Sequence, residues 1–317
     1  MIRTEEKPTF AAQAEGQARG AQTPGTGAEF VLTLHCPDSL GIVRSVADFL
    51  LSQECYIVDL KQFGDRTAGH FFMRVHFAAT ASTGDTAAVD RSAVDQLRDS
   101  FAPLAGEWNM DWRLERHDSR QRILVMVSRY DHCLNDLLVR ARSGELPVEI
   151  AAVVSNHPDL EGLAAWHGVP FHHIPVTPET KPQAEAALLE LVDALDVELV
   201  VLARYMQVLS DSATARLVGR AINIHHSFLP SFKGAKPYHQ AHERGVKTVG
   251  ATAHYVNSEL DEGPIIAQQV IEVDHTYTPA DLVSVGKDAE CRALTNAVRW
   301  HAEGRIILSG NRTVILR

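Results

Sequence analysis

The chain has 317 residues, of which 30 are Lys or Arg and 40 are Asp or Glu, so its formal net charge is −10. This length favours two domains, and a composition of 45% apolar and 22% charged residues is ordinary for a globular protein. The acidic balance argues against broad binding to nucleic-acid phosphates, although a local basic pocket for a small anion remains compatible with it.

Cysteine usage and hydropathy narrow the class further. Cys36, Cys55, Cys133 and Cys291 show no CxxC spacing, so we expect inert thiols and neither a zinc knuckle nor a disulfide framework. No apolar run approaches the ~20 residues of a membrane-spanning helix. The N-terminus shows no apolar signal segment. We therefore expect a cytoplasmic protein that contacts neither membrane nor nucleic acid.

Three segments with different composition follow one another along the chain. Residues 1–28 are rich in Ala, Gln, Gly and Thr, and such a segment buries too little apolar area to offset its ordering entropy. We expect a disordered tail there. The polar stretch RHDSRQ then separates two different rhythms of predicted elements. The expected domains are residues 29–116 and residues 117–317.

The first domain reads as a ferredoxin-like β-α-β-β-α-β unit. Apolar residues alternate over 30–34, as in a strand, and CPDSLG then places Asp38 or Ser39 to cap a helix. Two strand-like runs joined by the turn GDRTAG come next. A helix from about Ala87 to Phe101 and the strand WNMDWRLE complete the order.

The second domain alternates short apolar runs with helical stretches. The strand candidates are ILVMVS, VEIAAVVS, FHHIPV, ELVVLA and AINIHH, and the clearest helix is PQAEAALLELVDAL. This pattern predicts a Rossmann-like, mostly parallel sheet covered on both faces. A helix over 279–303 and a hairpin turning at Gly310–Asn311 follow near the end.

The polar residues that follow two strands point to a site. Ligands of open α/β sheets bind beyond the carboxyl ends of the strands, and Asn223, His225 and His226 end one such strand. Asp261 and Glu262 lie on the loop NSELDEGP between two later strands. A carboxylate and a histidine brought together across loops form the usual acid–base pair.

Other readings of these residues stay open at this point. A histidine at a strand end is often structural, and Asp261 could serve only its turn. His239 and His242 lie at i and i+3 on a predicted helix, but HQAHE is not HExxH and no third ligand stands at a diagnostic distance. We therefore expect no metal. Lys233 and Lys236 are expected to be solvated.

Four separated motifs resemble the folate-dependent formyltransferase family over about residues 120–300. They are NIHHSFLPSFKG, AHYVNSELDEGPII, RYMQVLS and SNH. The resemblance implies that Asn223, His225 and Asp261 are catalytic. It also implies contacts with the pterin side of the substrate from Met206, Gln207, Val208 and Leu209. Further substrate contacts are implied for His254 and Gly263, and His226 is another candidate around the site.

The N-terminal part resembles an ACT domain through LTLHCPDSLGIV. The resemblance implies a regulatory module that binds a small effector, often an amino acid, and the expected contact loop is Asp38, Ser39, Leu40 and Gly41. Backbone amides at a helix start suit a carboxylate. The alternative is a domain that only oligomerises the enzyme. We expect a homo-oligomer.

The combination of the two domains is that of the deformylase branch of the family, and Gln207 stands where transferase relatives often have Arg. Glycinamide ribonucleotide transferases carry a Gly-Ser-Asn phosphate loop after the first strand. Here VSRYDHCLNDLL has no glycine and places the carboxylate of Asp131 there. Methionyl-tRNA formyltransferase would need a C-terminal RNA-binding domain.

The expected reaction is therefore hydrolysis of 10-formyltetrahydrofolate to tetrahydrofolate and formate, a step of one-carbon metabolism linked to purine synthesis, without a cofactor. Asn223 and protonated His225 would donate to the formyl oxygen, and Asp261 would activate water and relay protons. The alternatives are formyl transfer to an amine other than the nucleotide, and a non-enzymatic folate or amino-acid sensor.

Overall fold

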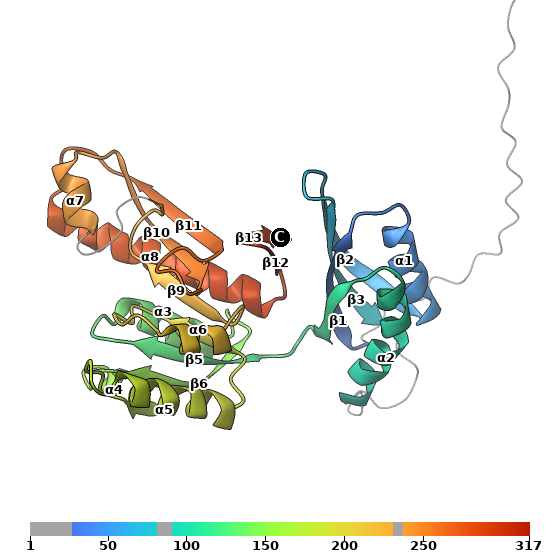
Figure 1. The fold of residues 1–317 in the computed structure, drawn as a ribbon, viewed down its shortest axis with the longest axis horizontal. Coiled ribbons are helices and arrows are strands. Elements are labelled where there is room, and N and C mark those ends of the chain that lie inside the picture. The colour runs from blue at the N-terminus through green and yellow to red at the C-terminus, as the bar shows by residue number, and fades with distance from the viewer. Residues whose placement is uncertain (1–26, 81–90, 231–236) are drawn as a thin grey trace, which may run out of the picture.

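A computed structural model of the protein describes residues 27–80, 91–230 and 237–317. Two bodies, each with its own sheet, are joined by a short connection after Arg116 (Figure 1). The tail expected over 1–28 lies almost entirely outside the described residues, as do Lys233, Lys236 and the start of the helix predicted from Ala87. Within the described ranges, no helix has the length and apolar character needed to cross a bilayer.

The N-terminal body is a four-stranded antiparallel sheet with two helices, which confirms the predicted β-α-β-β-α-β order. Its strands lie in the order β2-β3-β1-β4. The elements are β1 (Glu29–Pro37), α1 (Ile42–Ser52), β2 (Cys55–Asp65), β3 (His70–Ala79), α2 (Arg91–Glu107) and β4 (Asp111–Arg116).

Two local predictions for this body were wrong. Neither Asp38 nor Ser39 caps α1, because the cap position falls on Gly41, whose φ of +106° lies in the region that glycine tolerates best. The helix α2 continues to Glu107, beyond the predicted end at Phe101. Phe101 and Ala105 are both buried, so the apolar face of this helix extends past the predicted end.

The C-terminal body is built on a seven-stranded sheet in the order β11-β10-β9-β8-β5-β6-β7. Five strands are parallel, whereas β10 pairs antiparallel with both β9 and β11. The prediction of a mostly parallel sheet is confirmed. Its strands are β5 (Gln121–Val127), β6 (Val148–Ser155), β7 (Phe171–His173), β8 (Leu199–Leu202), β9 (Ala221–His225), β10 (Thr248–Tyr255) and β11 (Ile265–Glu272).

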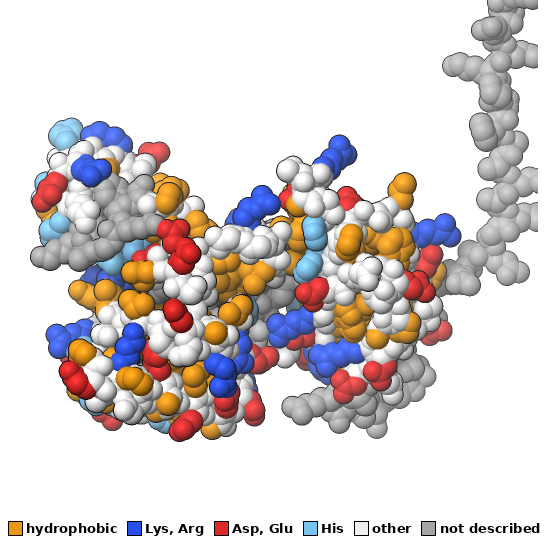
Figure 2. All heavy atoms as spheres, viewed as in Figure 1, with side chains coloured by type: hydrophobic (Ala, Val, Ile, Leu, Met, Phe, Trp, Pro, Cys, Tyr) orange, Lys and Arg blue, Asp and Glu red, His pale blue; other side chains and the backbone are white. Residues whose placement is uncertain are grey.

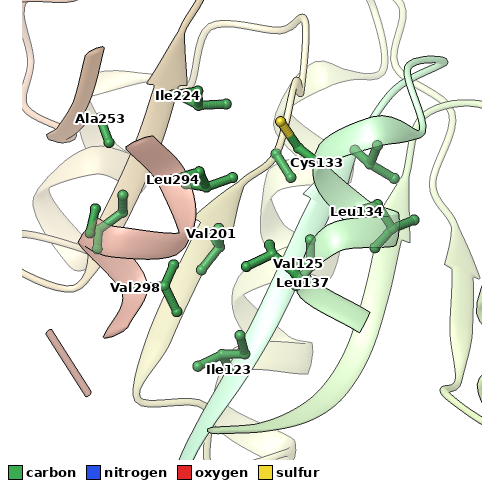
Figure 3. Close-up of a cluster of buried hydrophobic side chains, with 14 of the residues drawn as sticks. Ile123, Val125, Cys133, Leu134, Leu137, Val201, Ile224, Ala253, Leu294 and Val298 are labelled. Carbon is green, nitrogen blue, oxygen red and sulfur yellow. The ribbon is translucent and has the colours of Figure 1, made fainter. Parts of the chain in front are cut away.

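Helices cover both faces of this sheet. They are α3 (His132–Ser143), α4 (Glu161–Trp166), α5 (Lys181–Ala194), α6 (Asp211–Arg216), α7 (Pro237–Glu243) and α8 (Pro279–Ala302). Figure 3 shows side chains of α3 and α8, among them Leu137 and Val298, packed against Val125 of the sheet. The neighbouring Leu124 faces α5 on the other side, as strand alternation requires. Burial of each such side chain contributes about 1.5–3 kcal/mol.

A C-terminal hairpin, β12 (Ile306–Ser309) and β13 (Arg312–Ile315), confirms the turn predicted at Gly310–Asn311 and packs against the N-terminal body. Ile307 and Leu316 form a small buried cluster with Phe72 of β3. The hairpin lies between the two bodies (Figure 1).

Hydrogen bonds join the two bodies beside this cluster. Thr33 Oγ1 donates to the carbonyl of Gly304 over 2.9 Å, and Arg74 Nε and Nη2 donate to the carbonyl of Glu303 over 3.1 and 3.0 Å. Figure 2 shows further Lys and Arg side chains on both sides of this junction. The N-terminal body is therefore tied to the segment that immediately follows α8.

Candidate active site

The reversal of strand order places a cavity at the carboxyl edge of the C-terminal sheet. From β5 the chain moves outward to β6 and β7, and then returns to β8 and β9 on the other side. Crevices form where the order reverses in this way. A cavity of about 250 Å³ lies at this edge, between the end of β9, the loop after β8 and the loop after β10.

The three predicted catalytic residues, Asn223, His225 and Asp261, meet in this cavity and are here called the triad. Asn223 and His225 are two positions apart on β9, so their side chains emerge on the same face. His225 Nδ1 lies 3.1 Å from Asp261 Oδ2, and Asn223 Nδ2 lies 3.5 Å from Asp261 Oδ1. The carboxylate of Asp261 thus contacts two side chains of β9, although Asp261 lies 38 residues after Asn223 in the chain.

His254 completes this group from the neighbouring strand. It is paired with Asn223 in the β9–β10 register, and the two side chains contact each other over 3.2 Å. Its Nδ1 lies 2.9 Å from the carbonyl of Tyr255, so that nitrogen carries the proton and donates it. Its Nε2 lies 3.6 Å from Asp261 Oδ1. With the proton on Nδ1, Nε2 accepts from Asn223 Nδ2, so His254 orients the Asn223 amide as well as lining the cavity.

The backbone of the loop after β10 aims Asp261 at β9. Asp261 has a φ of +58°, a conformation that Asp adopts more readily than most residues. Two residues later, a Cβ on Gly263 would lie 1.7 Å from the carbonyl oxygen of Tyr255. Only glycine lets the loop approach the strand so closely. Gly263 was expected to contact substrate: among the described residues it is absent from the lining of this cavity but lines a neighbouring hollow together with Asp261, so the contact stays a prediction.

Electrostatics keep the Asp261 carboxylate ionised. Burial raises its pKa, but hydrogen bonds and charges from His225 and His254 lower it by more, so the pKa lies well below the usual range of an aspartate. The ionised carboxylate accepts the hydrogen bond of His225 Nδ1–H. His225 Nε2 is buried and has no hydrogen-bond partner among the described residues. That nitrogen is thus available for a ligand in the cavity.

The loop predicted to contact the pterin forms one wall. The backbone N–H of Met206 donates to Ser128 Oγ over 3.0 Å, and Ser128 Oγ donates to Asn156 Oδ1 over 2.7 Å. At the other end of the loop, the N–H of Ser210 donates to Glu185 Oε1 over 2.9 Å. Asn156 belongs to the SNH motif, so the structure gives that motif a physical role in holding this wall.

The side chains of this wall belong to residues that line the cavity. The cavity lining includes all four of the predicted residues, namely Met206, Gln207, Val208 and Leu209. The side chains of Met206 and Val208 are about half exposed, at 51% and 55%. An apolar surface of this kind, next to a few polar groups, is suited to a flat aromatic ligand.

Sequence reasoning missed a second group of polar side chains beside the triad, here called the Glu290 cluster: His132, Arg204, Tyr238 and Glu290. Glu290 Oε2 lies 2.7 Å from His132 Nε2 and 3.4 Å from Arg204 Nε, and Tyr238 donates to Glu290 Oε1 over 3.1 Å. Burial raises the pKa of Glu290, but His132 and Arg204 lower it by more. The available signal was a charged residue immediately after the buried strand ELVVLA.

His226 lies between the two groups. Its ring centre is 5.2 Å from that of His225 and 6.3 Å from that of Tyr238. Burial, together with the charges of Arg204 and His225, lowers its pKa to about 4. His226 is therefore neutral at pH 7, and it separates the triad from the Glu290 cluster.

The histidines considered for a metal lie elsewhere. His239 and His242 are on the short helix α7. Within the described part of the chain, ligand-type atoms gather within 4.8 Å in two groups, Glu29–His76–His117 and His132–Cys133–Glu290. Neither group includes the triad. The expectation that the reaction needs no metal remains a prediction.

Comparisons with known proteins agree with this geometry. The Formyl transferase family model matches residues 121–298. The chain is 61% identical over 287 residues to the formyltetrahydrofolate deformylase of Corynebacterium sp. strain P-1, a match that covers 90% of this chain and 98% of the relative.

Solved structures match different shares of this chain. The formyltetrahydrofolate deformylase of Burkholderia mallei superposes with a TM-score of 0.85 at 51% identity, over 92% of this chain and all of that one. The glycinamide ribonucleotide transformylase 1 of Symbiobacterium toebii matches only 65% of this chain and 98% of its own, with a TM-score of 0.60 and 36% identity. Since the match to deformylases covers both bodies, the chain belongs to the formyltetrahydrofolate deformylase family.

Proposed function

We propose that this cavity hydrolyses 10-formyltetrahydrofolate to tetrahydrofolate and formate. One observation carries the proposal: an amide, an imidazole nitrogen without a partner among the described residues and an ionised carboxylate converge in one cavity, on Asn223, His225 and Asp261. These are the groups that hydrolysis of a formamide requires. Membership of the deformylase family supports the same reaction.

Stabilisation of the tetrahedral intermediate falls to Asn223 and His225. The amide of Asn223 donates to the formyl oxygen, and His225 donates from Nε2 once its imidazole is protonated. The donation strengthens as negative charge develops on that oxygen, and removal of one such donor costs about 10²–10³-fold in rate. The ionised Asp261 on the opposite ring nitrogen of His225 stabilises the imidazolium and fixes its orientation.

Proton transfer falls to Asp261. Its carboxylate is ionised and lies at the cavity wall, so an oxygen is in place to accept a proton of the attacking water and to return a proton as the C–N10 bond breaks. His254 orients the Asn223 amide, because its tautomer leaves Nε2 to accept from Asn223 Nδ2. No step requires a group other than these side chains, the folate and water.

The acceptor is what separates this reaction from formyl transfer to an amine. The transformylase of Symbiobacterium toebii matches 65% of this chain, so much of the fold is common to proteins of both names. The test is to mix the protein with 10-formyltetrahydrofolate and a chelator, without any amine, and to quantify formate and tetrahydrofolate. Stoichiometric formate at enzymatic rates supports hydrolysis without a metal. Formyl transfer only after an amine is added would overturn the proposal.

We propose a regulatory role for the N-terminal body. The predicted effector loop, Asp38 to Gly41, lies around the start of α1 beside an open hollow of about 600 Å³. Leu40 is fully exposed there.

A homo-oligomer is supported by the edge strand β2, which exposes the side chains of Tyr56, Val58 and Phe63. Stimulation or inhibition of formate release by single amino acids tests the effector, and sedimentation tests the oligomer. If the whole protein were instead a folate or amino-acid sensor without enzymatic activity, it would show no turnover of 10-formyltetrahydrofolate.

A further inference from the structure

Arg204 is a further charged residue in the wall of the cavity that holds the triad. Its side chain is 9% exposed, and the residue lines the same cavity as Asn223, His225 and Asp261. Neither Nε nor Nη1 makes a hydrogen bond to any residue in the described parts of the chain. Donors that are buried without acceptors are costly, so their presence calls for an explanation.

The surroundings fix this guanidinium rather than neutralise it fully. The guanidinium carbon Cζ lies 4.9 Å from the centre of the Tyr130 ring, and Nε lies 3.4 Å from Glu290 Oε2. That carboxylate is shared, because His132 and Tyr238 contact it as well. The backbone of Arg204 has a φ of +65°, an uncommon conformation for a residue with a side chain. Arg204 is therefore held in one orientation while some of its donors remain open.

The proposed reaction releases a small planar anion into this cavity. The oxygen of water bonds to the formyl carbon, the C–N10 bond breaks, and N10 takes one proton of the water. The second proton passes from formic acid to solvent water, which leaves formate. A guanidinium matches a carboxylate with two parallel N–H donors. Asp261, which lines the same cavity, carries a negative charge and repels such an anion.

We propose that Arg204 binds the product formate and draws it away from Asp261. This inference rests on the hydrolysis proposed above, and it assigns to Arg204 a role in product binding that is separate from the triad. Glu290 opposes it, because its charge competes for the same guanidinium. Arg204 and Glu290 should therefore affect formate binding in opposite directions.

The test measures formate binding without turnover. Formate is titrated into the protein saturated with tetrahydrofolate, and binding is followed by saturation-transfer NMR on the formate proton. We expect Arg204→Gln to weaken formate binding at least tenfold, and Glu290→Gln to strengthen it several-fold. Arg204→Lys, which keeps the charge but loses the paired donors, should fall between the parent protein and Arg204→Gln.

The opposite signs distinguish binding from a structural role. Tetrahydrofolate affinity, measured for every variant, reports whether the cavity is intact. Unchanged formate binding in Arg204→Gln, or equal weakening by Arg204→Gln and Glu290→Gln, would overturn the inference, as would no binding of formate to the parent protein. If formate binds through Arg204 but the parent releases none from 10-formyltetrahydrofolate, the proposed hydrolysis fails and the anion site stands.

Discussion

Two buried carboxylates lie near the same edge of the C-terminal sheet, Asp261 in the triad and Glu290 in the cluster beside it. Each is contacted by basic side chains, and for each the effect of burial on the pKa is outweighed by these partners, so both are ionised. Asp261 stands on a loop and lines the cavity, whereas Glu290 stands on the long helix α8 and is 2% exposed.

The two carboxylates differ in which neighbouring polar atoms are left without a protein partner, and this difference indicates different roles. Both oxygens of Glu290 are engaged by protein groups, Oε2 by His132 and Arg204 and Oε1 by Tyr238. Around Asp261, His225 keeps its Nε2 free of partners among the described residues. We infer that Asp261 supports chemistry and that Glu290 mainly supports structure and the orientation of Arg204.

The largest effect is expected from Asp261→Asn. The amide keeps the size of the side chain but neither accepts a proton nor stabilises the imidazolium, so kcat for formate release should fall by about 10²–10⁴-fold. Folate binding, measured by fluorescence, should persist. Glu262→Gln, one residue further along the loop, serves as the matched control with near-parental kcat. Undiminished turnover in Asp261→Asn would remove this carboxylate from the mechanism.

For Glu290→Ala the expected loss is in stability. The substitution leaves Arg204 and His132 buried without their shared partner, and breaking a buried pair in this way costs about 3–5 kcal/mol. Urea unfolding followed by circular dichroism measures the free energy of unfolding. Glu290→Gln should cost less, because its amide still reaches Tyr238. A stable Glu290→Ala protein with lost turnover would reverse the roles assigned to the two carboxylates.

His226, between the two groups, should make the protein sensitive to mild acid. Its pKa is about 4 in the folded protein against 6.5 when unfolded, so above pH 6.5 it has no effect on stability. As the pH falls from 6.5 to 4, the unfolded chain takes up a proton that the folded protein excludes, and about 2–3 kcal/mol of stability is lost.

The variant His226→Asn tests this sign. It should show a smaller loss of unfolding free energy between pH 7 and pH 4.5 than the parent protein. Part of the loss should remain, because burial also lowers the pKa of His301 to about 4. An unchanged pH dependence in His226→Asn would place the proton uptake elsewhere.

The sequence predicted the triad because its parts carry local signals. Asn223 and His225 end a recognisable strand, and the resemblance to the formyltransferase family selected Asp261 over its neighbour Glu262. The geometry that joins them is not local. It depends on the β9–β10 register, which brings His254 to Asn223, and on the close approach of Gly263 to Tyr255.

The Glu290 cluster could not be predicted in the same way. His132, Arg204 and Glu290 lie far apart in the sequence, and each alone looks like an ordinary charged residue of a helix or loop. His132 and Glu290 meet because α3 and α8 pack side by side on one face of the sheet (Figure 3), and Arg204 reaches them from the loop after β8. Periodicity predicts each helix but not which polar residues two helices share.

The smallest effect is expected at the cavity wall, from Met206→Ala. If the cavity is open to the pterin as proposed, this half-exposed side chain is buried only when folate binds, and its loss should remove about 1 kcal/mol of binding. KM should then rise about fivefold, with the free energy of unfolding unchanged. Val218→Ala, at an exposed apolar position outside the described cavity wall, is the matched control and should change neither. A fall in stability without a rise in KM would mean that Met206 packs in the protein interior. The contrast between Asp261, which lines an open cavity, and Glu290, which is enclosed by protein groups, would then lose one of its supports.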